Sequence, residues 1–376
     1  MLAASVVAAV AVVGPLGSTP AAAAPGSFLV DDPIDAVDAA PDGTCATSSG
    51  TCTLRAAIQE ANAALGTTEI RFAPAADTSS LTLSGAGGAE VGDLDIAPGA
   101  TVRLIGNQIS ETDTTVVKAD ALGDRHVEVG AGARLELELV HLAGGSTDGD
   151  GGAIRNEGEV LVTNRVDSTG TYIALSGNSA AGSGGAIANV DGATLEVQDI
   201  SLAPTATRVD IDGNVAGADG GGISNGSGTV VLSGREDGAS HDVYLDSNSA
   251  VSDGGAVHNT SGSVTLGCRA FTRYGSATRG GDVFNGSGSL TFAGGGIEGG
   301  SATGDGGGLH NDKSGKVTVE AGACGTRGSI AGATAGGRGG GMYNLGTVSV
   351  PADATLSIYG ADKGRDASSG GGIAQA

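Results

Sequence analysis

The chain has 376 residues, of which 70 are glycine, and its formal net charge is −23. Glycine does not recur strictly at every third position, which excludes collagen, and 3% aromatic residues without tryptophan argue against an ordinary globular enzyme with a thick core. The acidic charge excludes nucleic acid and anionic membranes as partners; it favours neutral or cationic ones and leaves calcium open as a bound ion.

The first segment has the pattern of an export signal. Residues Leu2 to Leu16 are almost wholly apolar, and Ala21 to Ala24 supply small residues for cleavage. This pattern predicts a signal peptide over residues 1–23 and a mature chain that is secreted or displayed at the cell surface. No basic residue precedes the apolar run, so whether the sequence is complete at either end is left open. No second long apolar stretch follows, so we expect no transmembrane segment in the mature chain.

Four cysteines suit an oxidising compartment. Cys45 and Cys52 lie in a loop rich in glycine, serine and threonine and are predicted to form a disulfide that closes a small ring. Cys268 and Cys324 lie two repeats apart, which would separate their Cα atoms too far for a bond if they occupied equivalent positions. Their state is left open.

An N-terminal cap is predicted over residues 24–90. Within it, residues Thr53 to Leu65 form an amphipathic helix whose apolar face contains Leu54, Ile58 and Leu65, with Arg55 and Glu60 elsewhere. Such a helix would cover the first coil of a parallel rod, whose open edge otherwise invites aggregation.

Residues 91–376 contain a repeat in which the block Gly-Gly-x-apolar-x-Asn recurs at spacings of 26 to 36 residues. The blocks end at Asn156, Asn189, Asn225, Asn259, Asn285, Asn311 and Asn344. A strand with alternating apolar residues follows each block, and a Gly-Asn or Ser-Asn element precedes several. Each repeat therefore supplies about three strands and three turns, which predicts an all-β fold, a right-handed parallel β-helix solenoid with an N-terminal amphipathic capping helix.

The block asparagine and the apolar residue two positions before it share a face of their strand, so both are expected to point inwards. Coils stacked about 4.8 Å apart would allow successive amides to hydrogen-bond as a structural ladder. The residue between them would point outwards. In the last four blocks that residue is His258, Phe284, His310 and Tyr343, which we consider a candidate binding strip for sugar rings or a protein; mutual stacking that only stabilises the sheet is the alternative.

Two further features carry candidate chemistry. Asp212 and Asp246 occupy equivalent positions in adjacent repeats and are weak candidates for a metal site or an acid/base pair, although solvated turn residues would have the same pattern. The segment from Arg269 to Tyr274 is the one basic and aromatic cluster, expected either as a protruding turn for an acidic partner or as a loop that covers its own coil.

The run Cys52-Thr53-Leu54-Arg55-Ala56-Ala57-Ile58-Gln59-Glu60-Ala61-Asn62 resembles the CSLREA domain, from which Thr53 and Ala56 depart. The downstream blocks are similar to the repeats of chlamydia-type polymorphic outer membrane proteins. The resemblance covers residues 28–376 and implies a bacterial, exported right-handed β-helix, often at a cell surface. It implies no reaction, because the family has no agreed catalytic residues to carry over.

We therefore expect an exported, non-catalytic β-helix scaffold for surface display, adhesion or ligand binding, with an extracellular glycan or protein surface as its partner. The alternative is an enzyme, a polysaccharide lyase or glycoside hydrolase that acts in a groove of the β-helix. No catalytic residue and no cofactor is assigned, calcium apart. A purely structural spacer in a larger assembly also remains open.

Overall fold

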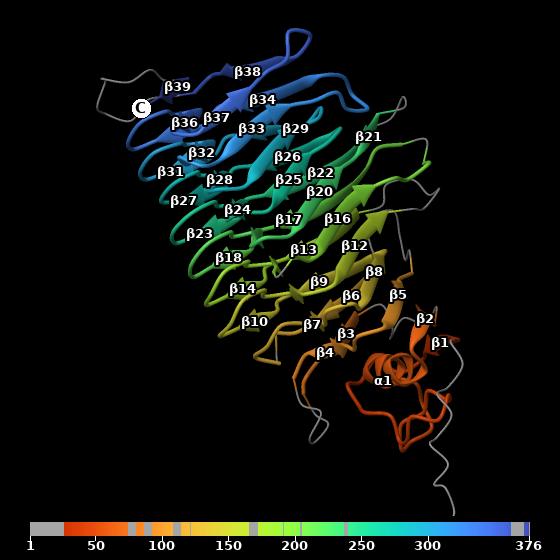
Figure 1. Cartoon of the computed structure of the whole chain (residues 1–376). Coiled ribbons are helices and arrows are strands. Elements are labelled where there is room, and N and C mark those ends of the chain that lie inside the picture. Colours follow the sequence, from red (N-terminus) through yellow and green to blue (C-terminus); the bar gives the residue numbers. More distant parts are fainter. Residues whose placement is uncertain are drawn as a thin grey trace, which may run out of the picture.

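The computed structural model describes residues 26–375 apart from 74–79, 86–91, 108–113, 121, 165–171, 191, 204, 237–239 and 362–371. Within these residues the chain winds into a parallel β-helix whose coils follow one another from the N-terminal helix to the C-terminal end (Figure 1). The predicted solenoid fold is confirmed. The predicted signal peptide, residues 1–23, lies outside the described residues.

Two long sheets form two sides of the rod. The first, which we call sheet A, contains β1 (Ser27–Val30), β2 (Gly66–Phe72), β5 (Ala100–Ile105), β8 (Arg134–Glu138), β12 (Glu159–Asn164), β16 (Thr194–Asp199), β20 (Thr229–Ser233), β25 (Ser263–Leu266), β29 (Ser289–Phe292), β33 (Lys316–Val319) and β37 (Thr347–Ser349). Sheet B contains β3 (Ser80–Thr82), β6 (Thr115–Lys118), β9 (Val140–Ala143), β13 (Tyr172–Ser176), β17 (Thr207–Asp212), β22 (Ser240–Asp246), β26 (Ala270–Arg273), β30 (Gly296–Glu298), β34 (Arg327–Ala331) and β38 (Thr355–Tyr359), and β21 (Arg235–Glu236) pairs antiparallel with β22.

Two sheets of shorter strands complete each coil. Sheet C contains β4 (Leu94–Ile96), β7 (Val127–Val129), β11 (Ile154–Asn156), β15 (Ile187–Asn189), β19 (Ile223–Asn225), β24 (Val257–Asn259), β28 (Val283–Asn285), β32 (Leu309–Asn311), β36 (Met342–Asn344) and β39 (Ile373–Gln375). Sheet E contains the two-residue strands β10 (Ser146–Thr147), β14 (Ser179–Ala180), β18 (Val215–Ala216), β23 (Ser249–Ala250), β27 (Ser276–Ala277), β31 (Ser301–Ala302) and β35 (Thr334–Ala335). A full coil thus has four strands rather than the three expected, because the corner before each two-residue strand separates sheet E from sheet B.

The block asparagines line the inside of the rod in one continuous ladder. Each side-chain amide donates to the Oδ1 atom of the asparagine in the next coil, at 2.7 to 2.9 Å. A second ladder joins Asn178, Asn214 and Asn248, with 2.9 Å between successive side chains. Amides can stack in this way because each carries both a donor and an acceptor, so every coil satisfies its neighbour.

The second ladder ends at Asn248, since Gly275 follows it in the next coil, and Asp282, which lies just before β28, reaches into the same row. Its Oδ1 atom accepts a hydrogen bond from the Gly275 backbone N–H at 2.7 Å, where earlier coils use an asparagine. The side chain is fully buried, and this burial raises the pKa of Asp282 well above its usual value. The carboxyl group thus takes the place of an amide in this row, and an ionisable group is buried as a result.

The N-terminal end is covered by α1 (Leu54–Ala64), which Thr53 caps by accepting a hydrogen bond from the Ala56 N–H. Its residues Leu54 and Ile58 belong to the same apolar core as the strands of the first coils. Two polar residues of the helix, Arg55 and Glu60, are buried although they lie off its apolar face. Arg55 is paired with Asp35 at 2.7 Å, and Glu60 accepts from the backbone N–H groups of residues 42 and 43.

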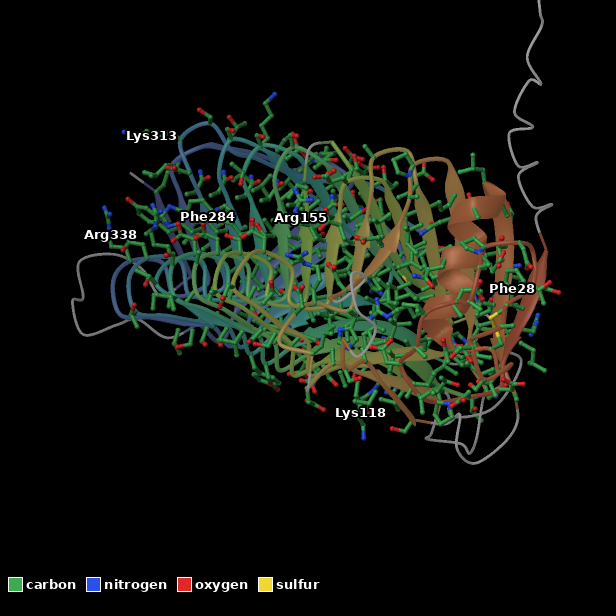
Figure 2. All side chains as sticks on the ribbon, turned by 90° about the horizontal axis from the view of Figure 1, so that it is seen from below. Phe28, Lys118, Arg155, Phe284, Lys313 and Arg338 are labelled. Atoms are coloured by element: carbon green, nitrogen blue, oxygen red, sulfur yellow. A yellow bond between two sulfur atoms is a disulfide. The ribbon has the colours of Figure 1, made fainter. Side chains whose placement is uncertain are left out.

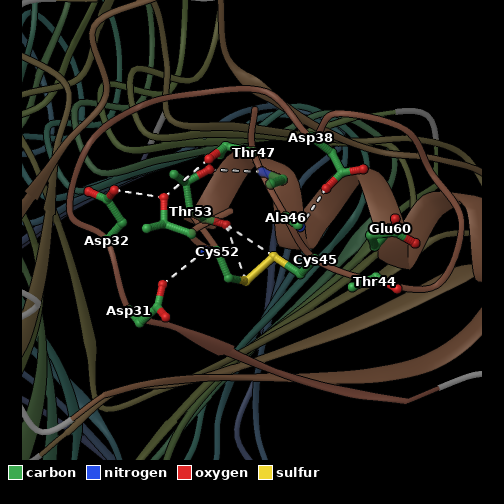
Figure 3. Close-up of a disulfide and its surroundings, with 12 residues drawn as sticks. Asp31, Asp32, Asp38, Thr44, Cys45, Ala46, Thr47, Cys52, Thr53 and Glu60 are labelled. Atoms are coloured by element: carbon green, nitrogen blue, oxygen red, sulfur yellow. Dashed lines mark hydrogen bonds between the residues drawn. A yellow bond between two sulfur atoms is a disulfide. The ribbon is translucent and has the colours of Figure 1, made fainter. Parts of the chain in front are cut away.

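The loop before α1 explains this burial, because it wraps around the helix and supplies the partners. Cys45 and Cys52 are bonded to each other as predicted, with 5.1 Å between their Cα atoms. Around the bridge, the Cys52 N–H donates to Asp31 and the Ala46 N–H donates to Asp38, both at 2.8 Å (Figure 3). The loop is therefore held by carboxylates that accept backbone hydrogen bonds rather than by an apolar core.

Candidate functional site

The outer face of sheet B gathers aromatic and charged side chains on successive coils. Residues that alternate along β22, β26 and β30 point away from the core, and the parallel register aligns them into columns. The two outward columns read Tyr244, Phe271, Gly296 and Asp246, Arg273, Glu298. The basic and aromatic cluster of the sequence therefore belongs largely to strand β26, and it is neither a protruding turn nor a capping loop.

A groove of about 510 Å³ opens on this face. Gly294 and Gly295, which precede β30, line it without side chains of their own. Its walls are Arg269, Phe271, Glu298, Arg327 and Tyr359, which come from four successive coils. The groove thus combines aromatic surface with cationic, anionic and hydroxyl groups.

The second disulfide lies beside this groove. Cys268 and Cys324 are bonded, with 5.1 Å between their Cα atoms, although they lie two coils apart. They meet because they do not occupy equivalent positions: Cys324 is in the loop before β34, and the bridge passes over Gly294, where a Cβ atom would lie 3.0 Å from the Cys324 Cβ atom. The bridge ties together two of the coils that supply the groove walls.

Arginine 269 and Arg273 are held in place on this face by acidic and aromatic neighbours. The Arg269 guanidinium lies 2.7 Å from Asp242, and the Arg273 guanidinium lies 4.3 Å from the Tyr244 ring centroid and 3.5 Å from Asp246. Tyr244 also stacks on Phe271, with 5.9 Å between the ring centroids. Such pairing limits the rotamer freedom of both arginine side chains.

Three carboxylates lie on the adjoining coils of the same face. Asp212 and Asp246 are register partners on β17 and β22, and Asp210 shares their outward orientation. Burial of Asp210, which is 4% exposed, raises its pKa to about 7 despite the Arg208 guanidinium 3.0 Å away. Burial, with the neighbouring Asp246 charge, also raises the pKa of Asp212. Asp210 can therefore carry a proton near neutral pH, and such an acid beside other carboxylates is an arrangement that can serve proton transfer.

Metal-ligand geometry occurs elsewhere among the described residues. Two groups bring three candidate ligand atoms within 4.8 Å of one another, Asp219 with Asp253 and His258, and Asp93 with Asp95 and Glu128. In each group an arginine already pairs with an acid: Arg279 donates to Asp253 at 2.9 Å, and Arg125 donates to Asp93 at 2.9 Å. Asp212 and Asp246 belong to neither group, and a calcium site at these two residues stays a prediction.

The four rings of the predicted binding strip lie on adjacent strands of sheet C and stack along the rod. Centroid separations are 5.2 Å for His258 to Phe284, 4.9 Å for Phe284 to His310 and 5.1 Å for His310 to Tyr343. Figure 2 shows Arg155, Phe284 and Arg338 along one side of the rod.

Little surface of these rings is exposed to solvent and available to a partner. Phe284, His310 and Tyr343 are only 3 to 5% exposed, since the ring faces cover one another and the guanidinium groups of Arg279 and Arg338 lie over Phe284 and Tyr343 at 4.7 and 4.3 Å. Burial also lowers the pKa of His310, which favours its neutral form. The geometry accounts for a stabilising stack, and binding through this strip stays a prediction.

A buried polar cluster that the sequence did not indicate lies near the junction of sheets A and B. The Thr207 hydroxyl lies 2.8 Å from Asp199 Oδ2 and 2.7 Å from His241 Nδ1. Burial raises the pKa of Asp199 to about 6, with the Thr207 hydrogen bond opposing the shift. All three side chains are buried, so the cluster resembles a hydrolytic triad in composition but offers no surface to a substrate.

Sequence reasoning found part of the groove and missed the rest. Arg269, Phe271 and Arg273 stood out as a cluster, whereas Glu298, Arg327 and Tyr359 lie one to three coils further along the chain and carried no local signal. The available clue was the run of glycines at 294–296, at a position where the neighbouring coils place outward side chains.

Comparison with known proteins identifies no relative of this chain. No protein-family model matches the chain, and neither a curated protein nor a solved structure is significantly similar to it. The resemblance to the CSLREA domain and to polymorphic outer membrane protein repeats therefore stays an expectation from the residues quoted above.

Proposed function

We propose that this protein is an exported, non-catalytic β-helix scaffold that binds an extracellular glycan on the outer face of sheet B. The observation that carries the proposal is the groove of about 510 Å³ that Gly294 and Gly295 line. Two disulfides support export, because such bonds persist in oxidising compartments. Among the residues that the structure describes, no helix has the length and apolar character needed to cross a membrane.

The composition of the groove suits a saccharide. A sugar ring has an apolar C–H face, which packs on aromatic rings such as Phe271 and Tyr359, and a rim of hydroxyl groups that pair with charged side chains. Arg269 and Arg327 supply donors, and Glu298 supplies acceptors. The walls come from stacked coils, so the groove can follow a polymer along several residues of its length.

The purified chain should therefore bind one class of soluble oligosaccharide in calorimetric titrations against glucans, mannans, xylans, chitin fragments and polygalacturonate. Ser329→Phe would fill the groove from its wall on β34 and should weaken that binding at least about tenfold, or about 1.4 kcal/mol. Thr291→Phe is the matched control, because it places the same ring on sheet A of the coil that forms the groove floor. Absence of binding to every glycan would contradict the proposal.

A glycoside hydrolase is the second candidate function, and the pKa of about 7 for Asp210 favours it. A protonated Asp210 could donate a proton to a leaving-group oxygen, while Asp212 or Asp246 acts as base or nucleophile. Release of reducing ends from a bound glycan would support this function, and Asp210→Asn as well as the double change Asp212→Ala with Asp246→Ala should abolish it. Binding without any release of reducing ends would leave the scaffold function alone.

A further inference from the structure

The corner that joins sheet B to sheet E departs from its own pattern at Tyr274. In the coils whose sheet E strand is described, this corner has a positive φ, and the residue is glycine except at Ser247 and Tyr274, whose φ values are both 53°. The glycine corners are Gly144, Gly177, Gly213, Gly299 and Gly332. A bulky residue in the left-handed region is strained, and such strain is found preferentially where a side chain has a function.

The Tyr274 ring packs against the protein surface at a defined place. Its Cδ1 atom lies 2.5 Å from the position that a Cβ atom would take on Gly299, so the ring lies over a residue that leaves room for it. The Arg273 guanidinium lies 5.5 Å from the ring centroid, and the Tyr274 N–H donates to the Glu298 carbonyl at 2.8 Å. Nevertheless 57% of the residue is exposed. The chain thus holds an aromatic surface towards solvent at the expense of backbone strain.

Charged groups suited to hydroxyl recognition lie at the strand ends beside this ring. Arg273 and Glu298 are register partners on β26 and β30, and Asp246 is the partner of Arg273 on its other side. Glu298 also lines the groove, so the ring and the groove share one wall. The ring therefore extends the groove towards sheet E rather than forming a separate patch.

We infer that Tyr274 is a stacking platform for one pyranose ring of the bound glycan, with Arg273, Asp246 and Glu298 as partners for the hydroxyl groups of that ring. This inference rests on the proposed glycan-binding function and adds a specificity-determining residue to it. Stacking requires the apolar face of the sugar, so the platform selects sugars whose C–H groups gather on one face.

The decisive test is Tyr274→Gly, because the two roles of this residue predict opposite effects on stability. Removal of a platform should weaken binding of the oligosaccharide that the wild-type chain binds by about fivefold to tenfold, while relief of strain raises the melting temperature by about 2 °C. A tyrosine that merely supports the fold would instead lower the melting temperature on removal. Ser247→Gly is the matched control, since it relieves the same corner conformation without removing a ring and should leave affinity within about twofold.

A second variant keeps the ring and reports on it directly. The chain lacks tryptophan, so Tyr274→Trp would introduce a single fluorophore whose emission should shift when the oligosaccharide stacks on it. Unchanged affinity in Tyr274→Gly, or an unchanged emission of Tyr274→Trp at saturating oligosaccharide, would overturn the platform while leaving the groove function intact. If the wild-type chain binds no oligosaccharide, or binds only a protein, both proposals fail together.

Discussion

Replacing Asn225 by alanine should destabilise the rod more than the same change at the end of the asparagine ladder. Asn225 lies in the middle of the ladder and is fully buried. Its Oδ1 atom accepts from Asn189 at 2.8 Å, and its amide donates to the Gly228 carbonyl at 3.0 Å and to Asn259 Oδ1 at 2.9 Å. Asn344, the last member, accepts from Asn311 at 2.7 Å and donates to the Gly346 carbonyl at 3.2 Å.

The difference can be worked from these contacts. Three hydrogen bonds lost at Asn225 are worth about 1 kcal/mol each, and leaving Asn259 Oδ1 buried without its donor adds roughly 1–3 kcal/mol. Asn225→Ala should therefore lower the free energy of unfolding by about 5 kcal/mol. Asn344→Ala removes two hydrogen bonds at the end of the ladder and strands no acceptor in a further coil, so it should cost about 2 kcal/mol.

Urea unfolding followed by far-ultraviolet circular dichroism measures both variants against the wild-type chain, with the slopes compared to confirm that each unfolds in one transition. The ladder interpretation predicts a lower midpoint for Asn225→Ala than for Asn344→Ala. Equal midpoints, or a cost below about 1 kcal/mol at Asn225, would refute the claim that the inner amides are coupled from coil to coil.

Three further predictions follow from buried groups and from the disulfides. Burial lowers the pKa of His126 from 6.5 to about 4, so the unfolded chain binds the proton more tightly than the folded chain. The free energy of unfolding should therefore fall by about 3 kcal/mol as pH falls from 6.5 to 4. His126→Gln should remove this loss when stability is measured across an acid titration. The sign is opposite at Asp282, whose pKa burial raises well above 3.8. The folded chain holds this proton more tightly than the unfolded chain, so stability falls as pH rises above 3.8. Asp282→Asn should therefore gain in stability relative to the wild type as pH rises, and a pH-independent difference would contradict this. Cys324→Ser opens a bridge across 56 residues and should lower the free energy of unfolding by up to about 4 kcal/mol. Cys52→Ser opens a ring across 7 residues and should lower it by about 2.5 kcal/mol. Thermal unfolding of both variants compares them, and a larger loss of stability in Cys52→Ser would contradict the ranking.

Two contacts that the sequence did not determine share a physical cause. The sequence leaves the state of Cys268 and Cys324 open, because equivalent positions would keep them apart, and the loop before β34 brings them together. Arg55 and Glu60 lie off the apolar face of α1, and the preceding loop buries them by supplying a carboxylate and backbone N–H groups. In both places a segment without regular periodicity determines the contact, and such segments have no pattern from which a position can be derived.

The sequence alone determined that the repeats form stacked coils of a β-helix. The recurrence of glycine pairs, alternating apolar residues and asparagine dictates a parallel stack, because each of these features is satisfied only when identical positions lie above one another. The tertiary structure alone decided the site. Phe271, Glu298 and Tyr359 belong to different coils, and only the register of sheet B places them around one groove. A repeat fixes the direction in which a side chain points, whereas a groove depends on which side chains are absent from neighbouring coils, and that is a property of the assembled surface.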